Sequence, residues 1–269
     1  MPERNQSVWK QLKNTHGQQV NYMTTISKLG VEYQPIMVDC ETLGTTPNTT
    51  PVLQLALVSF DPQTFEAKED FEIFLPLNEQ LQKGRKPDQG TVDWWGKQNA
   101  DVLKYIMEGV NAANPMSEQL FKVYHWILGQ CERTGKKPNA QTVFYAKPAA
   151  FDFPFVDGLF QEYKVPSPFH YRDVIDIHSH LVSMFQTAFF YTYKYELPRG
   201  AAVDMYWLFN DWAKTQEDSK REETAHNATA DCHYQLEWVR WAKEHCDRML
   251  SYYDSHQEVK GYLKELKVD

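Results

Sequence analysis

The stretch Ile36-Met37-Val38-Asp39-Cys40-Glu41-Thr42-Leu43-Gly44 runs from three apolar residues into two acidic residues and a glycine. The apolar run predicts a short strand, and Thr42-Leu43-Gly44 predicts the loop that follows it. Because side chains alternate along a strand, we expect the carboxylates of Asp39 and Glu41 on the same side, where they suit a divalent metal ion. For this segment alone, two solvated acids at a strand end are the alternative interpretation.

The segments that follow this strand predict an α/β fold. Residues 52–60 and 71–75 read as two further strands, and the turn at 61–63 between them indicates an antiparallel meander. Apolar residues then recur at spacings of three and four, which predicts helices over 101–110 and 117–133. Strands and helices alternate beyond that point, so we expect parallel pairing in this half of the chain. The alternating segments are strand 142–146, helix 154–163, strand 171–174 and helix 177–187.

Together these segments predict a mixed five-stranded sheet flanked by helices, with three antiparallel strands first and parallel strands after them. In this interpretation residues 34–247 form the main domain. Residues 1–33 are a polar N-terminal extension, and residues 248–269 are a C-terminal helical tail. Residues 188–224 interrupt the alternation, and we interpret them as an insertion beside the active site.

Composition and charge argue against several classes of protein. A net charge of −8 argues against a protein that coats duplex DNA through a broad basic surface. The four cysteines are scattered without a CxxC pair, which argues against a zinc site and favours free thiols in a reducing cytoplasm. The polar N-terminal residues argue against secretion, and no apolar run is long enough to predict membrane insertion. The expected location is therefore the cytoplasm, or the host cytoplasm if a phage encodes the protein.

Asp152 lies in Ala150-Phe151-Asp152-Phe153-Pro154, between a predicted strand and a predicted helix. An aspartate shortly before a proline in the first helical turn is a common helix N-cap. The alternative is a third metal ligand at the C-terminal end of a strand, where α/β sheets place their binding sites. The residues of this segment alone favour neither interpretation.

His226 and Asp231 are five residues apart, which corresponds to about 140° around a helix. Both side chains can face one site only if His226 precedes the helix and Asp231 lies in its first turns. Asn227 or Thr229 is suited to mark the start of that helix. Taken in isolation, a surface histidine and a helix aspartate are the plainer interpretation.

Taken in order, these motifs resemble those of the DEDD exonucleases of the histidine-containing subclass. More specifically, residues 35–245 are similar to the phage exonuclease A family and its bacterial exoribonuclease relatives. The motifs that carry the similarity are DCETLG at 39–44, TVDWW at 91–95, FDFP at 151–154, RD at 172–173 and HNATADC at 226–232. The resemblance implies a ribonuclease H-like fold, with an exonuclease domain over 34–247.

The same resemblance implies hydrolysis of phosphodiester bonds from the 3′ end of a single-stranded nucleic acid, with release of nucleoside 5′-monophosphates. Asp39, Glu41, Asp152 and Asp231 would hold two Mg²⁺ or Mn²⁺ ions, and His226 would act as the general base. The phage-like motifs favour DNA as the substrate, and trimming of RNA 3′ ends is the alternative. A nucleic-acid-binding module without catalysis is less consistent with four carboxylates facing a polyanion.

The residues expected to bind substrate lie next to these motifs. Thr42 and Leu43 follow the first predicted strand, and Leu43 is expected either to wedge between the last two bases or to pack in the core. Trp94 and Trp95 are expected either to stack on the terminal bases or to form a buried aromatic pair. Stacking on aromatic rings tolerates any base, as a nuclease without sequence preference requires.

Within the insertion, Lys194 and Arg199 are expected to bind substrate. They lie among tyrosines, and interleaved rings and cations suit a single strand because rings stack on bases and cations meet phosphates. The alternative is a helical hairpin in which the tyrosines pack with Trp207, Leu208 and Trp212. The insertion is also longer than the family pattern, so it is the segment expected to alter substrate choice.

Overall fold

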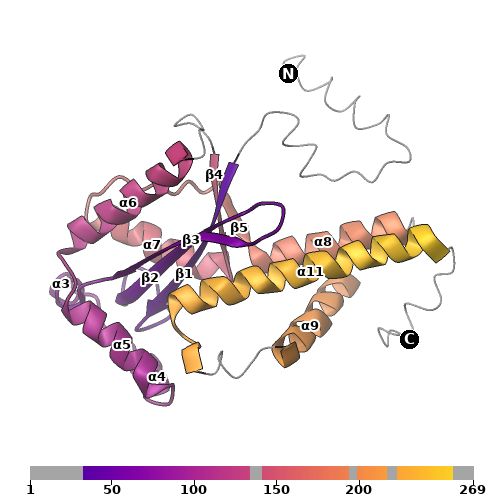
Figure 1. The fold of residues 1–269 in the computed structure, drawn as a ribbon. Helices are drawn as coiled ribbons and strands as arrows, with labels where there is room; N and C mark the ends of the chain where they lie inside the picture. The colour runs from indigo at the N-terminus through magenta and orange to yellow at the C-terminus, as the bar shows by residue number, and fades with distance from the viewer. Residues whose placement is uncertain (1–32, 134–140, 194–198, 217–222, 257–269) are drawn as a thin grey trace.

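A five-stranded mixed sheet forms the centre of the protein, in the order β3-β2-β1-β4-β5 (Figure 1). The computed structural model describes residues 33–133, 141–193, 199–216 and 223–256. β1, β2 and β3 pair antiparallel, whereas β4 is parallel to β1 and β5 is parallel to β4. The strands are β1 (Tyr33–Thr42), β2 (Val52–Phe60), β3 (Ala67–Phe74), β4 (Gln141–Ala146) and β5 (Val174–Asp176). The expected mixed sheet is confirmed.

Helices cover both faces of this sheet. Residues of α6 and α7 pack in one hydrophobic cluster with one face, and residues of α8, α9 and α11 pack in another with the opposite face. The helices are α3 (Leu77–Gln82), α4 (Gln89–Trp95), α5 (Ala100–Asn111), α6 (Met116–Arg133), α7 (Ala149–Glu162), α8 (Ile177–Tyr193), α9 (Arg199–Gln216) and α11 (Ala228–His256).

The central strand β2 shows why both faces must be covered. All nine of its residues are buried. Leu55 and Leu57 belong to the cluster formed with α6 and α7, whereas Ala56 and Val58 belong to the cluster formed with α8, α9 and α11. A strand buried on both faces reads as a nearly continuous apolar run, and 52–60 follows this pattern except at Gln54 and Ser59.

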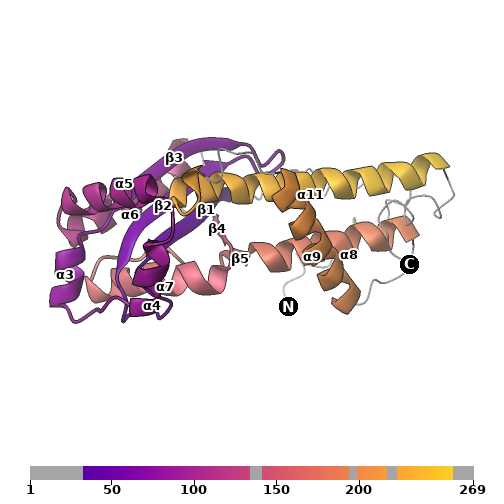
Figure 2. The same ribbon diagram turned by 90° about the horizontal axis from the view of Figure 1, so that it is seen from below.

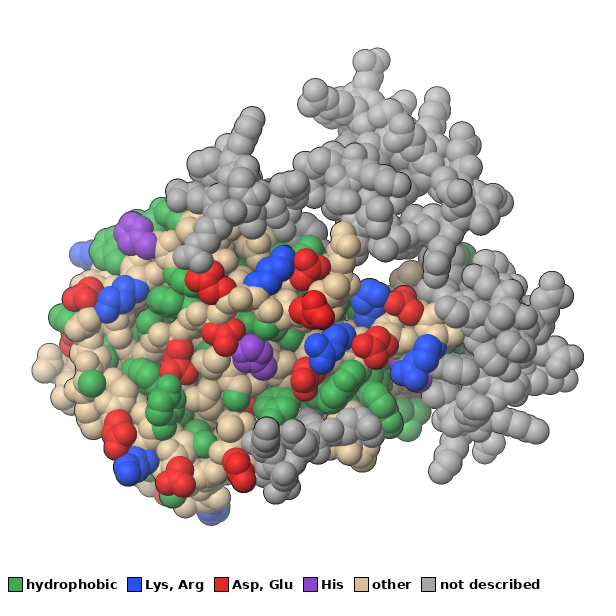
Figure 3. Space-filling model, viewed as in Figure 1, with side chains coloured by type: hydrophobic (Ala, Val, Ile, Leu, Met, Phe, Trp, Pro, Cys, Tyr) green, Lys and Arg blue, Asp and Glu red, His purple; other side chains and the backbone are tan. Residues whose placement is uncertain are grey.

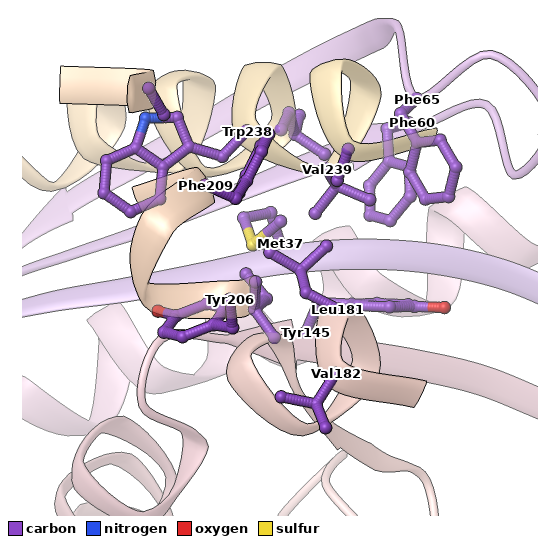
Figure 4. Close-up of a cluster of buried hydrophobic side chains, with 14 of the residues drawn as sticks. Met37, Phe60, Phe65, Tyr145, Leu181, Val182, Tyr206, Phe209, Trp238 and Val239 are labelled. Carbon is purple, nitrogen blue, oxygen red and sulfur yellow. The ribbon is translucent and has the colours of Figure 1, made fainter. Parts of the chain in front are cut away.

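The long helices α8 and α11 run side by side and extend well beyond the sheet, with α9 packed against them (Figures 1 and 2). Figure 4 shows the core between these helices and the sheet. The strands contribute Met37 and Tyr145, α9 contributes Tyr206 and Phe209, and α11 contributes Trp238. These side chains are at most 7% exposed, so apolar burial fixes α11 against β1.

The helix expected over 154–163 begins earlier, at Ala149. A proline favours the first turn of a helix, so Pro154 indicated a later start. The earlier start is stabilised by Asp176, whose carboxylate accepts a hydrogen bond from the N–H of Ala149 at 3.0 Å. The acceptor lies far along the chain, so the local sequence gives no sign of it.

The strand expected over 171–174 lies instead at Val174–Asp176. The N–H of Asp173 donates to the carbonyl of His170 at 2.8 Å, which closes a turn. Tyr171 is 76% exposed. These residues therefore precede the strand.

The described part of the insertion is helical. α8 continues to Tyr193, and α9 packs on it through Phe209, whose ring lies 5.5 Å from that of Phe185. The described part is thus helical, as the alternative expects, but the side chains of its tyrosines lie outside the described residues, so their packing stays a prediction. Leu208 is 58% exposed, and Trp207 is 52% exposed although its ring lies 5.8 Å from that of His178 in α8. The buried face of α9 follows helical spacing instead, through Ala202, Tyr206, Phe209 and Ala213.

Other parts of the chain lie outside the described residues. These are most of the N-terminal extension, at 1–32, residues 134–140, the pieces 194–198 and 217–222 of the insertion, and 257–269 within the expected tail. Figure 3 shows acidic and basic side chains interspersed along α11, where Lys243 and Asp247 form an ion pair. None of the helices in the described part of the chain is long and apolar enough to cross a membrane.

Candidate active site

Asp39 and Glu41 lie near the C-terminal end of β1, and their side chains are only 9% and 8% exposed. They pair with Ala56 and Gln54 of β2, and Ala56 belongs to the cluster that α11 covers. Because directly paired residues share a face of the sheet, both carboxylates point to the α11 side. The sequence expectation that they share one face is confirmed.

The loop after β1 is tightly folded. The hydroxyl of Thr42 donates to the carbonyl of Gly44 at 2.7 Å, and the N–H of Leu43 donates to the carbonyl of Pro51 at 2.9 Å. A side chain at Gly44 would place its Cβ 2.4 Å from Thr50 Cγ2, so only glycine fits there without a shift of its neighbours. This close approach holds the loop in place just after β1 ends at Thr42.

Asp152 lies in the first turn of α7 and is 2% exposed. Its Oδ1 accepts hydrogen bonds from the backbone N–H of Cys40 at 3.1 Å and from the Cys40 thiol at 3.4 Å. Its Oδ2 is buried without a hydrogen-bond partner. Asp152 therefore does not cap its own helix, whose N-cap position is Pro148, but reaches across to β1 between the two β1 acids.

His226 and Asp231 stand on either side of the start of α11. Asn227 caps the helix, because its side chain accepts from the N–H of Ala230 at 3.1 Å. His226 precedes the cap with a left-handed φ of 66°, and Asp231 lies in the first turn. This is the arrangement that the five-residue spacing required. Ligand atoms of Glu41, His226 and Asp231 lie within 4.8 Å of one another.

The four carboxylates form one electrostatic cluster. Burial raises the pKa of Asp39 well above its usual value, and the charges of Asp152, Glu41 and Asp231 raise it further. Burial, with Asp231 and Asp152, raises the pKa of Glu41 to about 8. Burial also raises the pKa of Asp152 to about 7, against the opposing effect of its hydrogen bonds from Cys40. Such a cluster favours either bound protons or bound cations.

The sequence of the whole domain agrees with a nuclease built around this cluster. The family model described as 3′–5′ exoribonuclease Rv2179c-like domain matches residues 34–242. The chain belongs to this family. The expectation of a DEDD-type 3′–5′ exonuclease family with the catalytic histidine is thereby confirmed, whereas a specific kinship with phage exonuclease A stays a prediction. No curated protein sequence matches the chain.

Solved structures show the fold of this Rv2179c-like domain. The zinc-bound complex of E. coli ExoI with single-stranded DNA has 16% identity and a TM-score of 0.54, covering 84% of this chain and 44% of that chain. E. coli ExoI with a dA16 oligonucleotide has 16% identity and a TM-score of 0.53, with the same coverage. The chain thus spans less than half of the ExoI chains. The likeness shows a ribonuclease H-like exonuclease fold.

The two tryptophans of the Rv2179c-like domain have different environments. Trp95 is 3% exposed, and its indole N–H donates to the carbonyl of Thr42 at 3.0 Å, which ties α4 to the end of β1. Trp94 is 40% exposed, and its ring centroid lies 4.6 Å from that of His226. Trp95 is therefore anchored in the core, as the burial alternative expects, whereas Trp94 is open to solvent beside His226, where stacking on a terminal base stays a prediction.

The structure describes only some of the remaining residues that are expected to bind substrate. Thr42 is 7% exposed, and Leu43 is 9% exposed and packs in a cluster with Leu53 and Trp95. Arg199 begins α9, but its side chain is not among those the structure describes. Lys194 lies outside the described residues. Substrate contacts by these residues stay predictions.

Gln235 is a site residue that the sequence motifs do not mark. Its side-chain amide donates to Asp39 Oδ1 at 2.8 Å, and its own Oε1 is buried without a hydrogen-bond partner. It lies four residues after Asp231, one helical turn along α11. That spacing places both side chains on one face of the helix, which is the signal that could have revealed it.

Proposed function

We propose that this protein is a metal-dependent 3′–5′ exonuclease that releases nucleoside 5′-monophosphates from single-stranded nucleic acid. The observation that carries the proposal is the cluster of Asp39, Glu41, Asp152 and Asp231 beside His226. Membership of an exoribonuclease domain family supports the same activity. A protein that only bound nucleic acid would gain nothing from four buried carboxylates facing phosphate.

The residues present fit divalent metal ions. Asp152 Oδ2 is buried with no hydrogen-bond partner, and a cation would satisfy it. Hard carboxylate oxygens suit Mg²⁺ or Mn²⁺, and we assign two ions to Asp39, Glu41, Asp152 and Asp231. When bound, such ions lower the pKa of a water and stabilise the leaving 3′ oxygen.

His226 takes the proton of the attacking water in this scheme. An imidazole titrates near neutral pH, so it can accept a proton at working pH. The side chain is half-buried next to the exposed Trp94 ring, so it is both fixed and open to substrate. Its distance from Glu41 and Asp231 also permits direct metal ligation.

Trp94 is the side chain best placed to stack on a terminal base, because it is 40% exposed and contacts His226. The family description and the sequence motifs disagree on whether the substrate is RNA or DNA. The family description names an exoribonuclease, whereas the phage-like motifs favour DNA. Because the family model covers residues 34–242, we favour RNA 3′ ends over the DNA expected from the motifs.

The test is digestion of 5′-labelled RNA and DNA single strands of one sequence in Mn²⁺ or Mg²⁺. We expect a ladder that shortens from the 3′ end, with 5′-monophosphates as products and RNA cleaved faster. A blocked 3′ terminus and the Asp39→Asn variant serve as controls, and both should stop cleavage. Binding without cleavage of either strand, or full activity in excess chelator, would refute the proposal.

A further inference from the structure

A chain of hydrogen bonds centred on Glu72 of β3 lies behind the segment that carries His226. Glu72 Oε1 accepts from Gln54 Nε2 and from the Thr229 hydroxyl, each at 2.7 Å. Glu72 Oε2 accepts from the Tyr105 hydroxyl at 2.5 Å. Since these donors belong to β2, α11 and α5, one carboxylate joins three elements to β3.

Gln54 connects this network to the acidic cluster. Its side chain is fully buried, and its Oε1 accepts from the backbone N–H of Ala228 at 3.0 Å, two residues after His226. In the sheet Gln54 pairs with Glu41, so their side chains share one face. One buried amide thus neighbours Glu41 on one side and the turn of His226 on the other.

The turn that carries His226 depends on such bonds. Its left-handed φ of 66° is a conformation that residues other than glycine adopt rarely. Thr224 and Asn227, on either side of His226, line an open pocket of about 520 Å³ together with Glu72 and Tyr105. Hydrogen bonds to other elements hold both ends of this segment: the N–H of Ala228 donates to Gln54 at one end, and at the other the Asn99 amide donates to the carbonyl of Glu223 at 2.9 Å.

We propose, on the basis of the proposed function, that Gln54 and Glu72 are positioning residues for His226. Gln54 holds Ala228 directly, and Glu72 fixes the orientation of the Gln54 amide while it binds Thr229 in the first turn of α11. Neither residue touches substrate. Together they set the imidazole against Glu41 and Asp231.

A matched control exists on the same strand. Asp70 also joins β3 to α11, through a contact of 2.8 Å with His233, and it lies two residues from Glu72. This pair is exposed, and its contact reaches α11 at His233, seven residues after His226. Loss of the Asp70 contact therefore reports on docking of α11 in general, whereas loss of the Glu72 contacts reports on the turn.

The experiment compares Glu72→Gln, Gln54→Leu and Asp70→Asn in the full metal-loaded chain. Outer-shell partners of this kind change activity by about 10–100-fold, so we expect that fall in kcat for the first two variants, with KM and Mn²⁺ affinity nearly unchanged. Asp70→Asn should keep its kcat. An equal fall in Asp70→Asn, or full kcat in Glu72→Gln, would overturn the proposal.

A second readout does not depend on activity. The ring signals of His226 in NMR spectra, assigned by their loss in His226→Asn, should broaden or split in Glu72→Gln and stay unchanged in Asp70→Asn. Unchanged signals in folded Glu72→Gln would overturn the positioning role. If the unmodified protein cleaves no nucleic acid, the proposed exonuclease fails, and these signals still decide whether Glu72 holds the imidazole. If Gln54→Leu does not fold, the results for Glu72→Gln are sufficient to test the proposal.

Discussion

At the scale of single residues, His226 is the member of the site whose role has two chemical possibilities. It serves either as general base or as a metal ligand with Glu41 and Asp231. His226→Asn separates them, because asparagine enters the left-handed region more readily than alanine and so preserves the turn. As a base, its loss should lower kcat by about 10²–10⁴-fold.

Calorimetric titration with Mn²⁺ is the accompanying measurement. For a base, the affinity of His226→Asn for Mn²⁺ should match that of the unmodified protein. Weak Mn²⁺ binding in the variant, with turnover restored at high Mn²⁺, would instead assign His226 as a ligand.

At the scale of elements, two contacts place α9 near the acidic cluster. The ring of Tyr206 in α9 stacks on His178 in the first turn of α8, with centroids 4.0 Å apart. Just before that turn, Asp176 holds the N–H of Ala149 in the first turn of α7, which carries Asp152. α9 therefore lies at the same end of the parallel strands as the site, namely at their C-terminal ends.

We expect substitution of Lys194 and Arg199 by alanine to raise KM and flatten its dependence on salt, because fewer counterions are released when the strand binds. The chemical step should stay nearly constant. KM measured across a salt series gives the result, with Lys214→Ala on the last turn of α9 as the comparison. A folded double variant that keeps the original KM at every salt concentration would leave the insertion a structural role only.

At the scale of the whole molecule, the carboxylate cluster makes stability depend on pH. The pKa values of Glu41 and Asp152 are raised to about 8 and about 7, so the folded chain holds protons that the unfolded chain has already lost. Stability should therefore be greatest near pH 5 and fall as pH rises through these values. Thermal melts in chelator from pH 5 to 8 measure this fall.

Mn²⁺ should reverse the trend, because a cation favours the charged carboxylates and competes with protons. Melting temperature should then rise with pH over the same range. Asp152→Asn, which removes one titrating group, should lessen both effects. A metal-free protein that becomes more stable from pH 5 to 8 would contradict the electrostatics of the cluster.

Much of this molecule could be predicted from local pattern. The strand period of two placed Asp39 and Glu41 on one face, and the helical angle required His226 to precede α11. What escaped prediction depends on contacts between distant segments. The carboxylate of Asp176, far along the chain, accepts the hydrogen bond that stabilises the start of α7. Gln235 becomes part of the site only because α11 packs against β1 and brings it to Asp39.

The order of these segments along the chain also governs when the site can exist during synthesis. Asp39, Glu41 and Asp152 leave the ribosome first, whereas His226 and Asp231 come with α11, the last helix the structure describes. Domains fold as their segments emerge, so the early part of the chain carries an incomplete set of ligands and no base. Under the proposed function, a nascent chain therefore cannot attack RNA, including the messenger being translated, until α11 has docked on the sheet.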